Sequence, residues 1–216
     1  MVSARAQILG RARRALSDVP KTDPAVDVPI DRPQPRRDLS GEQLVDLFAE
    51  QVADYRAVVE KVPEPEVAGA IAGALGGAAG TGLARILVPP GFPAEYVPDG
   101  VEIVADGPDV PVGVLDHCDG VLTTATIGIA ETGTIVLDHG PGQGRRAATL
   151  VPDLHVCVIH AGQVVAGLPE AVSALDPRRP QTWISGPSAT SDIELDRVEG
   201  VHGPRTLHVV IVTAGG

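Results

Sequence analysis

Short apolar runs punctuate the second part of the chain, and they constrain the fold more than any other feature. From Arg85 onward each run is bounded by Gly, Pro or Asp. Several lack strict alternation of apolar and polar residues, which is typical of strands covered on both faces. The runs are Ile86–Val88, Val101–Ala105, Gly120–Thr124, Thr134–Leu137, His155–Ile159, Val164–Ala166, Thr182–Ser185 and Leu207–Val212. This pattern predicts an α/β fold with a mostly parallel sheet flanked by helices.

Helical patterns dominate the region before these runs. Ser3 is a predicted N-cap for a helix that ends near Leu16, and Ser40 with Gln43 forms a capping box for a second helix reaching Val62. The other predicted helices span 66–79 and 168–175, and a Pro-rich arm separates the first two helices. We therefore expect residues 1–82 to form an N-terminal helical region with a Pro-rich arm, and residues 83–216 to form the α/β core.

The charge balance excludes two classes of partner. The formal net charge is −11, whereas binding to nucleic acid or to an anionic membrane surface depends on Lys and Arg. The sequence has no apolar run long enough to span a bilayer and no secretory signal. We expect a cytoplasmic protein with no nucleic-acid partner and no membrane span.

The two cysteines, Cys118 and Cys157, are too few to hold a four-thiolate iron–sulfur cluster. His117 adjoins the first and His155 lies two residues before the second, but the spacing typical of zinc sites is absent. We predict no metal site and no cofactor in this chain, and we expect both cysteines to pack as small buried groups.

Glu131 lies among small and apolar residues in the segment Ala130-Glu-Thr-Gly-Thr134. Burial there would raise the pKa of its carboxyl group and make it a candidate catalytic acid, base or nucleophile, with Thr132 and Gly133 beside it as ligand contacts. The alternative is a structural carboxylate that caps backbone amides in a tight turn.

The segment Gly140-Pro-Gly-Gln-Gly-Arg145-Arg146 combines glycines with two cations. Backbone N–H groups freed by glycine and the two guanidinium groups would suit a phosphate or carboxylate. The segment is not a Walker loop, which needs Gly-Lys-Ser/Thr. The alternative is a surface loop without a ligand.

Two further loops carry polar side chains. Ser188, Thr190 and Asp192 lie in the loop from Gly186 to Glu194 and would hold a polar ligand or cap the turn. His202 lies in the turn Gly200-Val-His-Gly-Pro204, where it would carry protons or bond its own loop.

Together these segments resemble one family. Ala130-Glu-Thr-Gly-Thr134, Leu150-Val-Pro-Asp-Leu-His155, Gly186-Pro-Ser-x-Thr-x-Asp-Ile-Glu194 and Gly200-Val-His-Gly-Pro204 stand in the order and spacing of the LUD domain. Because it lacks the cysteines that would hold an iron–sulfur cluster, the chain resembles the lactate utilization protein C family within this group.

This resemblance implies a role in the bacterial oxidation of L-lactate to pyruvate beside proteins A and B, which carry the iron–sulfur clusters. It also implies a fold similar to the NagB/RpiA/CoA-transferase-like group, in which some CoA transferases use a Glu in a Glu-x-Gly setting as nucleophile. Glu131-Thr-Gly133 has a similar appearance, although fold analogy does not establish a reaction.

Three hypotheses follow from the residues and the resemblance. The leading one is a subunit of a lactate-oxidising system that binds a small carboxylate or phosphate-bearing ligand, with its loops gathered at the carboxyl ends of the strands. The second is an independent CoA-transferase-like or cyclo-ligase-like enzyme that uses Glu131. The third is a module that only senses or carries a small carboxylate.

Overall fold

The computed structural model describes residues 3–19, 39, 41–76, 83–190, 198–199 and 203–213. The chain divides into two compact units, Met1–Gln34 and Pro35–Gly216. The first unit contains helix α1 (Ala4–Ala15), and the Ser3 hydroxyl accepts a hydrogen bond from the Ala6 amide at 3.2 Å, which confirms the predicted cap. Ser40 and the Pro-rich arm lie outside the described residues.

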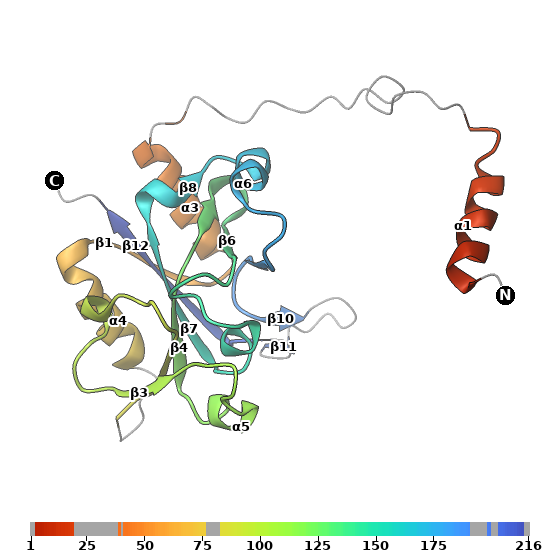
Figure 1. The fold of residues 1–216 in the computed structure, drawn as a ribbon. Helices are drawn as coiled ribbons and strands as arrows, with labels where there is room; N and C mark the ends of the chain where they lie inside the picture. The colour runs from red at the N-terminus through yellow and green to blue at the C-terminus, as the bar shows by residue number, and fades with distance from the viewer. Residues whose placement is uncertain are drawn as a thin grey trace. The chain divides into compact units, whose positions relative to one another are not determined.

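The second unit is built on a six-stranded sheet in which every neighbouring pair is parallel (Figure 1). The strand order is β1-β12-β7-β4-β2-β3. The bounds are β1 (Val58–Pro63), β2 (Arg85–Val88), β3 (Glu102–Ala105), β4 (Gly120–Thr124), β7 (Leu154–His160) and β12 (Thr206–Thr213). The mostly parallel sheet flanked by helices is therefore confirmed.

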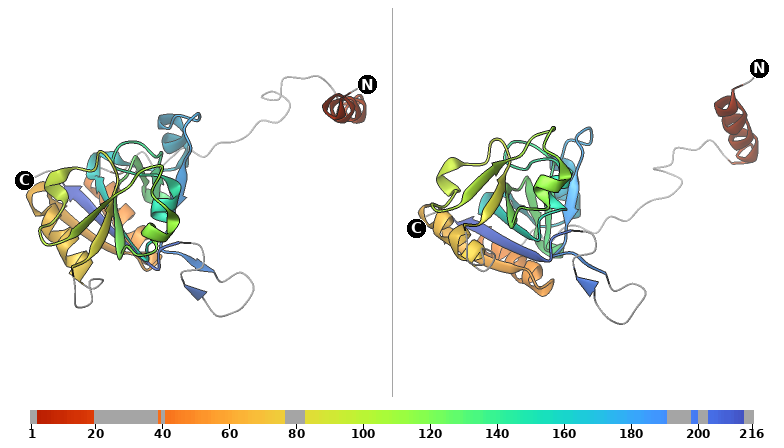
Figure 2. Two further views of the ribbon diagram at one scale, coloured as in Figure 1. Left: turned by 60° about the horizontal axis from the view of Figure 1, so that its bottom comes forward. Right: turned by 90° about the horizontal axis from the view of Figure 1, so that it is seen from below.

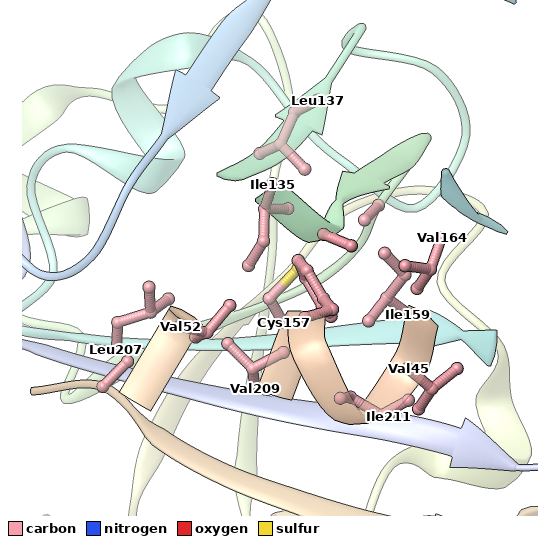
Figure 3. Packing of buried hydrophobic residues seen from close by; sticks show 14 residues of the cluster. Val45, Val52, Ile135, Leu137, Cys157, Ile159, Val164, Leu207, Val209 and Ile211 are labelled. Atoms are coloured by element: carbon pink, nitrogen blue, oxygen red, sulfur yellow. The ribbon is translucent and has the colours of Figure 1, made fainter. Parts of the chain in front are cut away.

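Successive side chains along each strand point to opposite faces of this sheet, so a hydrophobic core forms on each face. On one face, β12 contributes Val210 and Val212 to a cluster with helix α4 (Val67–Gly76). On the other face, β12 contributes Leu207, Val209 and Ile211 to a cluster with helix α3 (Gly41–Asp54) and a second sheet. Figure 3 shows the side chains of this second cluster converging. Burial on both faces explains why the central strands are mostly apolar.

The second sheet has the order β8-β5-β6-β9. Its strands are β5 (Ile127–Ile129), β6 (Thr134–Leu137), β8 (Val164–Val165) and β9 (Thr182–Ile184). Strands β5 and β6 form an antiparallel hairpin that the sequence pattern did not predict, because β5 has only three residues and one is Gly128.

Shorter elements complete the unit. They are helices α5 (Val112–Leu115) and α6 (Leu168–Ala174), strands β10 (Ala189–Thr190) and β11 (Val198–Glu199), and the 3-10 turns η1 (Glu64–Glu66), η2 (Ala94–Tyr96), η3 (Ala130–Thr132), η4 (Arg146–Thr149) and η5 (Ala161–Gln163). Figure 2 shows β10 and β11 near the start of β12, outside the two larger sheets.

The helix predicted from Ser40 to Val62 is wrong in its second part. Helix α3 ends at Asp54, and Arg56 adopts a left-handed φ of 67°, which stops the helix. The chain then forms β1, which pairs with β12 from Val58 to Pro63. Val59 and Val62 therefore belong to a strand, where β-branched side chains pack well.

Among the described residues, no helix combines the length and the apolar character needed to cross a membrane. Both cysteines are buried, as predicted: Cys118 lies in a cluster with Leu115 and Val121, and Cys157 lies in the cluster under α3.

Candidate functional site

A pocket of about 300 Å³ opens at the amino ends of β7 and β12, where these parallel strands begin. It collects residues from three of the four motifs identified in the sequence: Leu150 and His155, the loop Gly186 to Ser188, and Gly203 with Pro204. The Ser188 amide donates to the Pro204 carbonyl at 2.8 Å, which joins the last two motifs directly. Three segments that are separate in the sequence, with 31 residues from His155 to Gly186 and 15 from Ser188 to Gly203, thus form one pocket.

Arg146 supplies a cation at this pocket. Its side chain is exposed, it opens η4, and its Nη1 lies 3.4 Å from the Thr182 hydroxyl, which also lines the pocket. No acidic partner of Arg146 is found in the part of the chain that the structure describes. The guanidinium group with hydroxyls nearby suits a carboxylate or phosphate.

His155 forms part of the pocket wall and is 1% exposed. Its Nε2 lies 2.7 Å from the Thr123 hydroxyl on the neighbouring strand β4. Burial lowers the pKa of His155 to about 4, so the imidazole is neutral near pH 7. Cys157 lies two residues further along β7 and is paired with the same Thr123 on β4. Burial raises the pKa of its thiol to about 12. It is therefore an inert thiol.

A line of hydroxyl groups connects the hairpin turn to the pocket. Thr132 Oγ1 lies 2.7 Å from Thr134 Oγ1, which lies 2.8 Å from the hydroxyl of Ser185 in the pocket wall. Thr132 is exposed and does not itself line the pocket, and Thr134 Oγ1 also donates to its carbonyl at 3.3 Å.

The predicted burial of Glu131 is wrong, because the turn η3 presents this side chain to solvent while Ala130 before it is buried. Its Oε2 lies over Gly167 at the start of α6, 2.7 Å from the position a Cβ atom would take there. Glu170 Oε2 lies 3.5 Å from the same position. Glu131 is not among the described residues that line the pocket.

Gly133 has a structural role in this turn. Its φ is +55°, and a Cβ atom would lie 2.5 Å from the backbone carbon of Gln51 in α3. Only glycine fits the left-handed turn that packs against the helix.

Arg145 and Arg146 are separated in the structure. Arg145 Nε lies 3.0 Å from Asp106 Oδ1, and its Nη2 donates to the Val110 carbonyl. Amides of the glycine segment are also bonded within the protein, including Gly142 to Pro90 and Gln143 to Gly140. Of the two arginines, Arg146 is the one whose geometry suits an anionic ligand.

The expectation that the loops gather at the carboxyl ends of the strands is wrong. Gly140, Pro141, Gly144 and Arg145 do line a depression of about 670 Å³ beside Gly91 and Gly107, which follow β2 and β3. Ser188 and Gly203 instead lie at the amino ends, because Gly203 and Pro204 directly precede β12 and the Ser188 amide is bonded to the Pro204 carbonyl. The predicted loops therefore occupy both ends of the sheet.

Three predicted site residues have no described side chain: Asp192 and His202 lie outside the described residues, and Thr190 is described only as part of β10. Within the described residues, no group of three or more His, Cys, Asp or Glu side chains is placed to hold a metal ion. Sequence reasoning missed Thr123, Thr182, Ser185 and the place of His155 in the pocket. A polar residue within an apolar strand, as at His155, was the available signal.

Comparison with known proteins gives consistent results. A family model described as the LUD domain matches residues 114–212. A Deinococcus radiodurans protein named "Lactate utilization protein C" is 44% identical over 178 residues, covering 81% of this chain and 82% of the relative. A Geobacillus protein of the same name is 32% identical over 100 residues, 43% of this chain and 41% of the relative. The crystal structure of a DUF162 family protein from Deinococcus radiodurans has 40% identity and a TM-score of 0.69, covering 81% of this chain and 99% of that one.

Proposed function

Because this chain belongs to the LUD-domain family of lactate utilization protein C, we propose that it is a cytoplasmic component of bacterial L-lactate oxidation to pyruvate that binds a small anionic ligand in the Arg146 pocket. The relatives' names support the role in lactate utilisation. The observation that carries the ligand site is the convergence of three sequence motifs on one cavity with Arg146 at its wall. A small carboxylate or a phosphate group is the ligand chemistry that a guanidinium group with neighbouring hydroxyls binds.

The redox chemistry belongs to partners in this proposal. The two cysteines lie in separate parts of the hydrophobic core, so their thiols do not form a site for an iron–sulfur cluster. Iron–sulfur proteins of the A and B type would carry the clusters and accept the electrons. Affinity purification of this chain from cells grown on lactate should recover proteins with iron–sulfur absorbance, and recovery of none would contradict the partnership.

Ligand binding is testable with one matched pair of variants. Acetate and inorganic phosphate, titrated separately, should each be tried as ligands, and at least one should bind the native chain. Arg146→Gln should weaken that binding about tenfold or more, because it removes a charge-assisted hydrogen bond. Arg178→Gln is the control, since Arg178 is exposed, pairs with Asp176 and does not line the pocket. Equal affinity in the two variants would remove Arg146 from the site.

A second candidate function is favoured by one observation. Glu131 is exposed, which leaves it accessible as the nucleophile of a CoA-transferase-like or cyclo-ligase-like enzyme. Glu131→Gln should change the free energy of unfolding by less than about 0.5 kcal/mol, because exposed substitutions have small effects. Growth on lactate with this variant then reports function alone. Failed growth with normal protein abundance would favour the enzyme, and normal growth would remove Glu131 from the functional residues.

A further inference from the structure

His139 has a backbone conformation that is unusual for a residue with a side chain. Its φ is 57°, in the left-handed region that glycine adopts without strain. A position of this kind persists only where the surrounding structure determines it, and such positions gather at functional sites. The histidine side chain is therefore the feature to explain.

Side-chain hydrogen bonds hold the loop around His139 in place. The Asp138 amide donates to Gln143 Oε1 at 2.7 Å, and Gln143 Nε2 donates to the Thr126 hydroxyl at 2.8 Å. Asp138 also pairs with Arg179 through Oδ2 at 2.9 Å. Because Gln143 is buried, its hydrogen bonds are shielded from water and strengthened. The backbone that carries the imidazole is therefore fixed.

Both ring nitrogens of His139 are hydrogen-bonded. Nδ1 lies 2.8 Å from the Gly144 carbonyl oxygen, which carries no proton, so Nδ1 must be the donor. In the neutral ring, Nε2 is then an acceptor. Its partner at 2.9 Å is the hydroxyl of Thr182 on β9. The Thr182 hydroxyl therefore donates its single proton to the ring.

Thr182 extends this order to Arg146. Its proton points toward His139, so the lone pairs of its oxygen are available to accept from Arg146 Nη1, which lies 3.4 Å away. Thr182 is buried, whereas Arg146 is exposed. An exposed arginine loses conformational freedom when it closes on a ligand, and a fixed acceptor beside it reduces that loss.

We propose that His139 is a positioning residue of the anion site, and that through the Thr182 hydroxyl it holds the Arg146 guanidinium group at the pocket wall. This inference rests on the proposed anion site. His139 is not among the described residues that line that pocket, and its ring lies instead at the depression beside β2 and β3. It therefore acts on a ligand only through the other two side chains.

Reciprocal variants of His139 separate its two hydrogen bonds. His139→Asn has an amide one bond nearer the backbone, which can still donate to the Gly144 carbonyl but is too short to reach Thr182. His139→Gln has the longer side chain, whose carbonyl can accept from Thr182. Thr182→Val removes the hydroxyl, and Thr182→Ser keeps it. Dissociation constants for acetate and for inorganic phosphate are measured by NMR titration of the full chain at about pH 8, where an ordinary histidine is neutral.

We expect His139→Asn and Thr182→Val each to weaken binding of the tighter of the two anions about three- to tenfold, as the ordering of one long side chain would. His139→Gln and Thr182→Ser should stay within about twofold of the native chain. The double variant His139→Asn/Thr182→Val should bind no more weakly than Thr182→Val alone, because the two residues act through one chain of hydrogen bonds.

The outcomes separate this inference from the anion site. Equal binding by His139→Asn and His139→Gln, or tighter binding by His139→Asn, would show that His139 only supports its own loop. Additive losses in the double variant would also overturn the inference. If the His139 variants do not fold, equal binding by Thr182→Val and Thr182→Ser overturns it. All these results leave the anion site intact, provided that Arg146→Gln still weakens binding. If the native chain binds neither anion, or if Arg146→Gln binds as tightly as the native chain, the anion site fails and this inference fails with it.

Discussion

Single residues of the pocket combine structural and chemical roles, and His155 is the clearest case. Its imidazole is buried, it is hydrogen-bonded to Thr123 on the neighbouring parallel strand, and it still contributes to a cavity wall. Burial lowers its pKa to about 4, against about 6.5 for an unperturbed histidine. The native fold therefore favours the neutral ring, and protonation opposes folding.

This shift predicts a pH dependence of stability. The contribution of His155 is fully present above about pH 6.5 and is lost as the pH falls toward 4, because the unfolded chain then binds a proton that the native chain does not. The loss should total roughly 3 kcal/mol. Urea unfolding from pH 7.5 to 4 should show native stability declining faster than that of His155→Leu. Parallel curves for the two proteins would contradict the shift.

The site residues were only partly predictable from the sequence. Arg146 and Ser188 were identified by residue type and loop context, and they do share a pocket. The exposure of Glu131 was not predicted. Its apolar neighbours in sequence are buried in the hairpin, whereas Glu131 itself lies in the turn and faces solvent. The pairing of Arg145 with Asp106 joins residues 39 apart and left no local signal.

At the level of elements, strand order decides which loops meet. The segments before β7 and β12 lie together because these strands are parallel neighbours that begin level with each other, at Leu154 and Thr206. The sequence contained this information, since a segment that directly precedes a strand lies at its amino end. The region from Arg56 to Pro63 was harder, because Val59 and Val62 continue the helical spacing of α3 and the left-handed residue at the break is an arginine instead of a glycine.

The contact between the β5–β6 hairpin and α3 supports one prediction for these elements. Gly133→Ala should lower the free energy of unfolding by about 2–4 kcal/mol, since it combines a strained left-handed backbone with overpacking against α3. The close approach to the Gln51 backbone, at 2.5 Å from a Cβ position, leaves no flexible side chain to move aside.

Gly162→Ala is the matched control, because a Cβ atom there meets nothing within 4 Å. Its unfolding free energy should stay within about 0.5 kcal/mol of the native value. Chemical denaturation measures both variants. An equally small effect at Gly133 would show that the hairpin can move away from the helix at little cost.

At the scale of the whole molecule, the α/β unit contains the pocket, the two sheets and the residues matched by the family model. The N-terminal unit, Met1–Gln34, has its own helix, and none of the residues of α1 is buried. Its apolar residues, such as Ile8 and Leu16, remain 65% and 61% exposed. Every buried hydrophobic residue in the described part of the chain lies in the α/β unit, and hydrophobic burial is the main source of folding stability.

Removal of residues 1–34 tests this division of the chain. We expect the truncated protein to unfold at the same urea concentration and with the same steepness as the full chain, because the deleted helix contributes no buried side chain and the steepness reports the surface exposed on unfolding. Its affinity for acids in the Arg146 pocket should also be unchanged, since every residue that lines the pocket lies in the second unit. A lower midpoint would show that residues 1–34 contribute to the stability of the chain. If stability and acid binding are unchanged but growth on lactate is lost, the N-terminal unit has a role in the cell that is separate from the pocket, such as holding a partner of the lactate-oxidising system.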